Sequence, residues 1–188
     1  MMIKHVLGKV LFVTLLIKSC AFAQLFLPPK NMDLFGKQYT LAFKNENENG
    51  SLYEYTADGE SVENWTHLIT LTHVKYNLNP YQFITATKKG LDGKSVVPHY
   101  SLYEKGKHGY VTLIFEPSQD RLNFEADVQK SFHLENCDGT IIMQYGVHKP
   151  VFQQLTGAEK TVMLKAIYEQ LKLDAEQIAQ NQWAPICE

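Results

Sequence analysis

Alternating apolar and polar residues predict a series of β-strands, and the clearest of these covers residues 124–136. One parity of this segment is apolar up to Leu134 apart from Lys130, and the other parity is polar. Such alternation is typical of an antiparallel strand with one face on a hydrophobic core and one face in water. Asp138-Gly139 then predicts a turn into a second alternating strand over residues 140–148. The acidic residues of the wet face are Glu125, Asp127 and Glu135.

Shorter alternating segments predict further strands earlier in the chain. Residues 39–43 and 51–56 are expected to pair through a hairpin at Asn49-Gly50, the strongest short hairpin signal. Residues 68–76 form another strand, in which apolar residues alternate with threonine. Residues 100–104 and 110–116 are expected to form a further pair.

Two segments carry the signals of helices. Asn79-Pro80 is typical of a helix N-terminus, and Gly90 predicts the end of that short helix. Thr156 and Glu159 form a capping box, which predicts the start of a longer helix. Apolar residues then recur at spacings of three and four, and the pattern ends before Pro185. The apolar positions are Ala158, Val162, Met163, Ala166, Ile167 and Leu171.

The order of these elements predicts the fold class. Strands, a short helix, more strands and a long helix indicate an α+β domain with a mainly antiparallel sheet. The long C-terminal amphipathic helix is expected to cover the sheet together with the short mid-chain helix. A single domain over residues 24–188 fits the length of the chain.

Residues 1–23 have the three parts of a secretory signal peptide. Basic residues come first, residues 10–17 are apolar except for Thr14, and Ala21-Phe22-Ala23 offers small residues for cleavage between Ala23 and Gln24. The apolar run is much shorter than the roughly 20 residues that span a bilayer, so a stable membrane anchor is not expected. Lipidation at Cys20 is the alternative. The protein is therefore expected in the periplasm or outside the cell.

Export changes the charge of the chain and its cysteine count. Removing residues 1–23 takes away three lysines and no acid, so the net charge moves from −2 to −5. With Arg121 as the only arginine, this balance argues against nucleic acid as a partner. Cys137 and Cys187 remain, and an even pair in an exported chain predicts a disulfide. Free thiols and a catalytic cysteine are the alternatives.

The motifs of common enzymes are absent from the sequence. There is no HExxH, GxSxG, GxxxxGK or GxGxxG, and no two mature histidines have the i,i+4 spacing of a metal-binding helix. The acids of residues 124–136 are interpreted as a solvated strand face, since glycosidase carboxyls need a cleft. No catalytic residue, metal ligand or cofactor is therefore predicted.

Aromatic residues provide the one candidate binding surface. Tyrosine combines an aromatic body with a polar tip, which suits recognition, although it is also an ordinary residue of half-buried strands. Tyr53, Tyr55 and Trp65 are the candidate contacts, together with loops over residues 44–49 and 91–97.

Residues 59–66 carry a signature of the form GE-x-V-x-N-W-T, preceded by Tyr53-Glu54-Tyr55 and followed much later by Asn136-Cys137-Asp138-Gly139. This pattern resembles one found in small exported bacterial proteins of unknown function. The order of elements is also similar to the PsbP-like α/β/α fold of exported or lumenal accessory proteins. Neither resemblance implies catalytic residues.

These observations favour a non-enzymatic exported domain that binds a protein or a small ligand. A hydrolase with a dispersed active site is the alternative from another class, because such a site leaves no motif. A secreted virulence effector is a third hypothesis, which the same signal peptide would serve.

Overall fold

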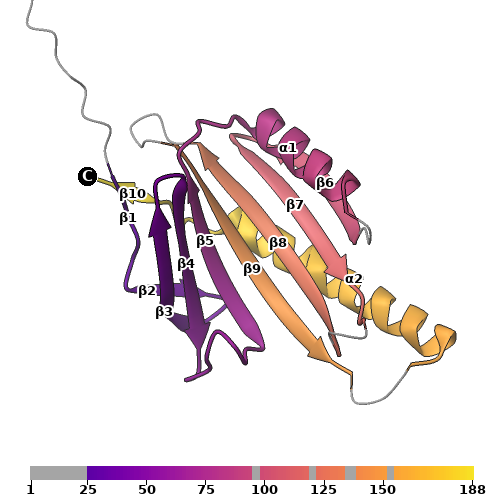
Figure 1. Ribbon diagram of the computed structural model, residues 1–188. Helices are drawn as coiled ribbons and strands as arrows, with labels where there is room; N and C mark the ends of the chain where they lie inside the picture. The colour runs from indigo at the N-terminus through magenta and orange to yellow at the C-terminus, as the bar shows by residue number, and fades with distance from the viewer. Residues whose placement is uncertain (1–24, 95–97, 119–121, 134–138, 152–154) are drawn as a thin grey trace, which may run out of the picture.

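The computed structural model describes residues 25–94, 98–118, 122–133, 139–151 and 155–188. Ten strands and two helices lie within these ranges (Figure 1). The helices are α1 (Pro80–Asp92) and α2 (Gly157–Gln180). The strands are β1 (Phe26–Leu27), β2 (Asn31–Leu34), β3 (Lys37–Asn47), β4 (Gly50–Ala57), β5 (His67–Val74), β6 (His99–Lys105), β7 (His108–Phe115), β8 (Asn123–His133), β9 (Thr140–Pro150) and β10 (Ile186–Cys187).

Eight of the strands form one sheet in the order β2-β3-β4-β5-β9-β8-β7-β6, and every neighbouring pair is antiparallel. The sheet is therefore two four-stranded meanders that meet where β5 pairs with β9. The short strands β1 and β10 form a separate antiparallel pair. This architecture confirms the prediction of an α+β fold with an antiparallel sheet.

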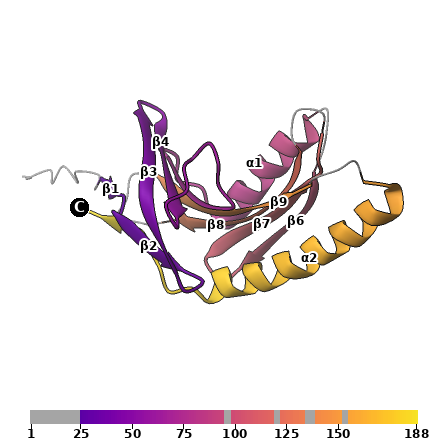
Figure 2. The same cartoon turned by 90° about the horizontal axis from the view of Figure 1, so that it is seen from below.

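The two helices lie on opposite faces of the sheet. Figure 2 shows α1 on one side and α2 running along the other, with β3 and β4 turned away from the plane of the remaining strands. The main core lies on the α2 face, where Ile167, Leu171 and Ile178 of the helix pack on the sheet. A smaller core lies under α1 and centres on Phe83 and Leu91.

The capping signals are confirmed at both helix starts. Asn79 accepts from the backbone N–H of Gln82, and Thr156 accepts from that of Glu159, each within a complete capping box. The predicted end of α1 at Gly90 is wrong. The helix continues to Asp92 because Leu91 is buried against the sheet, and this packing outweighs the low helix propensity of one glycine.

The expected wet face of the long strand is wrong at two positions. Asp127 and Ser131 are each 2% exposed, on the β8 face that was predicted to be solvated. Ser131 is covered where α1 crosses the sheet, and its Oγ accepts from the backbone N–H of Gly109 at 2.9 Å. The alternation of apolar and polar residues identified the two faces of β8, but it did not show that other elements cover part of the polar face.

The α2 helix also differs from the expected pattern. Its buried positions belong mainly to its second half, whereas Val162 is 71% exposed. The first turns of α2 extend beyond the edge of the sheet (Figure 1). The predicted apolar stripe is therefore only partly a core contact.

Two glycines provide a matched test of this packing. A Cβ added at Gly109 would lie 2.7 Å from Cδ1 of Phe83 and 3.1 Å from the carbonyl oxygen of Pro80, so Gly109→Ala should lower the unfolding free energy by about 1–3 kcal/mol. A Cβ at Gly90 meets nothing within 4 Å, so Gly90→Ala should raise it by about 0.5–1 kcal/mol. Urea denaturation measures both values, and equal effects of the two substitutions would contradict this account of α1.

Candidate functional site

A cleft of about 810 Å³ opens at one end of the sheet, where the β6–β7 turn, the end of β8 and the C-terminus of α2 meet. We call it the α2 cleft. The side chains that give it its character are cationic or aromatic. They are Lys107, His108, Lys130, Phe132, His133 and Trp183.

Lys130 is the residue that interrupts the apolar parity of β8, and the structure gives the reason. Its Nζ donates to the carbonyl oxygens of Ile178 at 3.3 Å and Asn181 at 3.4 Å, which are carbonyls of the last turn and cap of α2. A cation at this end of a helix is favourable because the terminal carbonyls carry partial negative charge. Lys130 is only 3% exposed, and this burial lowers the pKa of its ammonium group.

Aromatic rings form one wall of the cleft. The ring centroids of Phe132 and Trp183 are 5.3 Å apart with nearly perpendicular planes, and His108 meets the same phenylalanine edge-on at 5.0 Å. The Trp183 backbone N–H donates to Oδ1 of Asn181 at 2.7 Å, which holds the segment after α2 in place. Edge-to-face packing of this kind fixes the rings and leaves an apolar surface toward the cleft.

His108 is oriented by a backbone group. Its Nδ1 lies 2.7 Å from the carbonyl oxygen of Ser131, which can only accept, so Nδ1 carries the proton. Partial burial is the main cause that lowers the pKa of His108, while the hydrogen bond to Ser131 opposes the shift. The ring therefore favours the neutral form, with Nε2 as its acceptor.

The charges of the cleft favour an anionic ligand. Lys107 and Lys130 carry positive charge, and Glu104 is the acid among the lining residues. Within the ranges that the structure describes, no group of three His, Cys, Asp or Glu side chains could hold a metal ion. The arrangement is thus suited to binding a charged group beside an apolar body.

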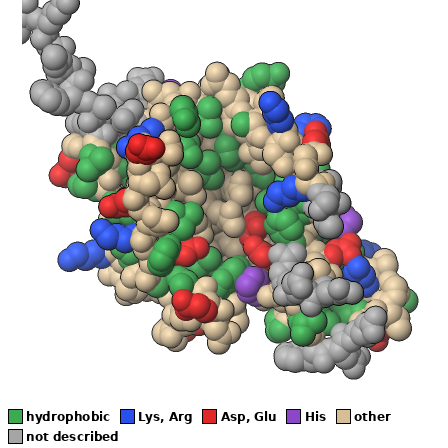
Figure 3. Space-filling model, in the orientation of Figure 1, with side chains coloured by type: hydrophobic (Ala, Val, Ile, Leu, Met, Phe, Trp, Pro, Cys, Tyr) green, Lys and Arg blue, Asp and Glu red, His purple; other side chains and the backbone are tan. Residues whose placement is uncertain are grey.

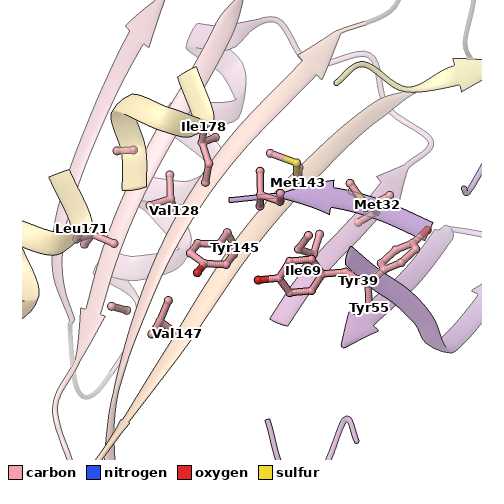
Figure 4. Close-up of a cluster of buried hydrophobic side chains, with 14 of the residues drawn as sticks. Met32, Tyr39, Tyr55, Ile69, Val128, Met143, Tyr145, Val147, Leu171 and Ile178 are labelled. Atoms are coloured by element: carbon pink, nitrogen blue, oxygen red, sulfur yellow. The ribbon is translucent and has the colours of Figure 1, made fainter. Parts of the chain in front are cut away.

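The expected tyrosine surface is corrected by the structure. Tyr53 and Tyr55 are 3% and 0% exposed and belong to the α2-facing core, in which Figure 4 labels Tyr55. Tyr39 lies beside them, and burial raises its pKa to about 12. These rings fill the core, so they present no surface to a partner. Of the three predicted contacts, only Trp65 is partly exposed.

The predicted contact loops are also corrected. Residues 44–47 belong to β3, and the hairpin closes with Asn47 paired to Gly50. Gly50 is needed there because a Cβ would collide with the backbone of His73 on the neighbouring strand. Residues 91 and 92 belong to α1, and residues 95–97 lie outside the described ranges.

Residues 59–66, which carry the signature, form a compact loop before β5. The Glu60 carboxylate accepts from the Thr66 backbone N–H at 3.0 Å and from its hydroxyl at 2.6 Å. The Thr56 hydroxyl in turn donates to the Glu60 carbonyl. Desolvation favours the neutral Glu60, but the hydrogen bonds from Thr66 and His67 together lower its pKa. Glycine suits the turn that opens the loop, where Gly59 has φ +78°.

Trp65 anchors this loop to the sheet. Its ring stacks on that of His148 with centroids 3.4 Å apart, and its carbonyl accepts from the same histidine at 3.2 Å. Gly146 leaves room for the indole, because a Cβ there would lie 3.1 Å from the ring. The glutamate, tryptophan and threonine of the signature therefore have a structural role in this chain.

The part of the sheet that α1 leaves uncovered is a second polar surface. Figure 3 views this face, and acidic side chains lie around an uncharged centre. Gln129 donates to Gln144 across two strands at 2.8 Å, and His148 lies 3.6 Å from the Glu125 carboxylate. These pairs join neighbouring strands, so we assign them to the sheet rather than to a site.

Comparison with known proteins gives the family. The sequence model of one protein family matches residues 26–183, most of the chain. The chain belongs to that family of small bacterial proteins. No curated protein and no solved structure matches it, so the PsbP-like arrangement stays a prediction.

Several predictions fall on residues outside the described ranges. They include the signal peptide, its cleavage between Ala23 and Gln24, and Cys137. Cys187 lies in β10 at the other end of the expected disulfide. In the part of the chain that is described, no helix is long and apolar enough to cross a membrane.

The lowered pKa values of two histidines predict that the stability of the protein depends on pH. Desolvation lowers the pKa of both His108 and His67 below 6.5, so the folded state binds fewer protons than the unfolded state. Stability from these groups is present above about pH 6.5 and is lost as the pH falls toward their folded pKa values. Urea unfolding should show this decrease, and His108→Gln should make it shallower.

The comparison of variant with native protein isolates the histidine. Burial raises the pKa values of Glu54 and Asp174, and these groups act in the opposite direction as the pH falls. Glu54 and Asp174 are present in both proteins, so their contributions cancel when the two dependences of stability on pH are subtracted. An identical slope in native protein and variant would contradict the assignment to His108.

Proposed function

We propose that this protein is an exported, non-enzymatic binding domain of the bacterial periplasm or exterior. Its α2 cleft binds a small ligand with a negatively charged group and an aromatic or apolar body. The observation that carries the proposal is the juxtaposition of Lys107, Lys130 and His108 with the wall formed by Phe132 and Trp183.

The physical argument has two parts. Cations beside an apolar wall attract an anion and allow its body to leave water, which gives both orientation and affinity. The wall is also held in place before binding, because Lys130 and Asn181 fix the end of α2 beneath Trp183. A preorganised site loses less entropy when it binds.

Anilinonaphthalene sulfonate, an anion with an aromatic body, is a suitable probe of the mature protein. We expect its fluorescence to rise on binding and Lys107→Glu to weaken that binding by about tenfold, because the change replaces attraction with repulsion. Lys107 is exposed, so the substitution should leave the fold intact. Fluorescence titration gives the dissociation constants.

Lys105→Glu is the matched control. It makes the same change in net charge at an exposed residue of β6 that does not line the cleft. Trp65→Phe leaves Trp183 as the single tryptophan, and energy transfer from it to the probe should persist. Equal weakening by both lysine substitutions would overturn the assignment of the site.

The proposed disulfide between Cys137 and Cys187 is supported by neighbouring contacts. Cys187 pairs with Phe26, whose ring centroid is 5.9 Å from that of His73 on β5. That end of β5 pairs with the start of β9 at Thr140. Cys137 precedes Thr140 by three residues, so the length of the chain keeps Cys137 within about 10 Å of Thr140. A bond there would fasten the C-terminus to the sheet.

Intact mass after expression with export in a bacterial host tests both processing and the disulfide. We expect a chain that begins at Gln24 and is lighter than its reduced form by two hydrogens. Alkylation without reductant should label neither cysteine, whereas Cys187→Ser should leave one thiol to be labelled. Two labelled thiols in the native protein would end the disulfide proposal, and a chain that keeps residues 1–23 would end the export proposal.

A further inference from the structure

A second hollow of about 180 Å³ lies beside the α2 cleft along the same two elements. Ser101 and Tyr103 of β6 line it, and Glu104 is the next residue of the strand and lines the cleft. On the helix, the lining passes from Glu176 in the hollow to Ala179 in the cleft. The helix wall is therefore continuous, whereas on β6 Glu104 lies on the opposite face from Ser101 and Tyr103. We call the combined feature the α2–β6 trough.

The length of the trough follows from its walls. The helix wall runs from Tyr168 to Asn181, which is about 20 Å at the rise of an α-helix. On the other side, β6 runs from Ser101 to its end at Lys105, which is about 13 Å at the rise of a strand, and the β6–β7 turn carries Lys107. The helix wall matches about six residues of extended peptide.

The chemistry of the trough changes along its length. Leu171 and Ala175 provide apolar side chains in the hollow, and Tyr103 and Ser101 add hydroxyl groups. Glu176 and Lys172 give the hollow one charge of each sign, whereas at the far end Lys107 and Lys130 outnumber Glu104. A lining of mixed polarity suits a peptide, whose backbone needs hydrogen-bonding partners, better than an alkyl chain.

We propose that the trough binds the C-terminal segment of an extended peptide, with its free carboxylate at the cationic end. The inference rests on the proposed function, since it names the ligand of the same cleft. A terminal carboxylate satisfies the anion preference of Lys107 and Lys130, and the preceding residues lie along Tyr103 and Glu176. β6 is the last strand of the sheet, so a peptide beside it can also pair with its edge.

Two degenerate hexapeptide pools test this inference. They are identical except that one ends in a carboxylate and the other in a carboxamide, and each is passed over the immobilised mature protein. We expect at least about tenfold greater retention of the carboxylate pool, measured by mass spectrometry, since the amide lacks the charge. Lys107→Glu should abolish the preference.

A substitution in the hollow separates the peptide from the smaller ligand. Ser101 is exposed, so Ser101→Trp should fill the hollow without disturbing the core. We expect this variant to lose peptide retention and to bind anilinonaphthalene sulfonate as before. Ser101→Ala is the matched control and should retain both ligands.

The outcomes distinguish the two proposals. Equal retention of the two pools, no retention of either, or unchanged retention by Ser101→Trp would overturn the peptide inference. The proposed function would survive each of these results if the sulfonate still bound in a manner sensitive to Lys107→Glu. Failure of the sulfonate to bind the native protein would instead count against the proposed function.

Discussion

The pairing of β5 with β9 is the interaction on which the rest of the molecule depends. Eight consecutive residue pairs, from His67 with Val147 to Val74 with Thr140, join two meanders that would otherwise each end in an open edge. The junction also completes the main core, because Leu71 and Met143 are buried on its α2 face. Once it forms, α1 and α2 have a single continuous sheet on which to pack.

The C-terminal end of α2 contacts the sheet at a buried charged residue, Lys130. Lys130 lies among apolar residues and donates to the carbonyls at the end of the helix, so one residue serves both the sheet and the helix terminus. A cation removed from water is costly unless it is paired, and the terminal carbonyls supply that pairing. The same contact places Trp183 beside Phe132. The cleft is thus a consequence of how α2 ends.

The signature segment shows why a distinctive motif need not mark a site. Glu60 and Thr66 close a loop on themselves, and Trp65 fastens it through His148 on β9. These contacts join the beginning of β5 to its partner strand. They therefore support the central junction, and they lie on elements other than those that line the α2 cleft.

The sequence by itself determined the local features of this protein: the antiparallel strands, both helix N-caps, the α+β class and the one charged residue in the apolar face of β8. Each depends on neighbours within a few residues, which periodicity and capping rules describe. Only the tertiary structure decided which tyrosines are buried, which acids are covered and what Lys130 binds. Tyr53 meets Phe26, Lys130 meets Ile178 and Trp65 meets His148 through contacts between residues distant in the chain. The cleft belongs to this second group, because its walls come from β6, β8 and α2, whose side chains meet only after the sheet has closed at β5 and β9.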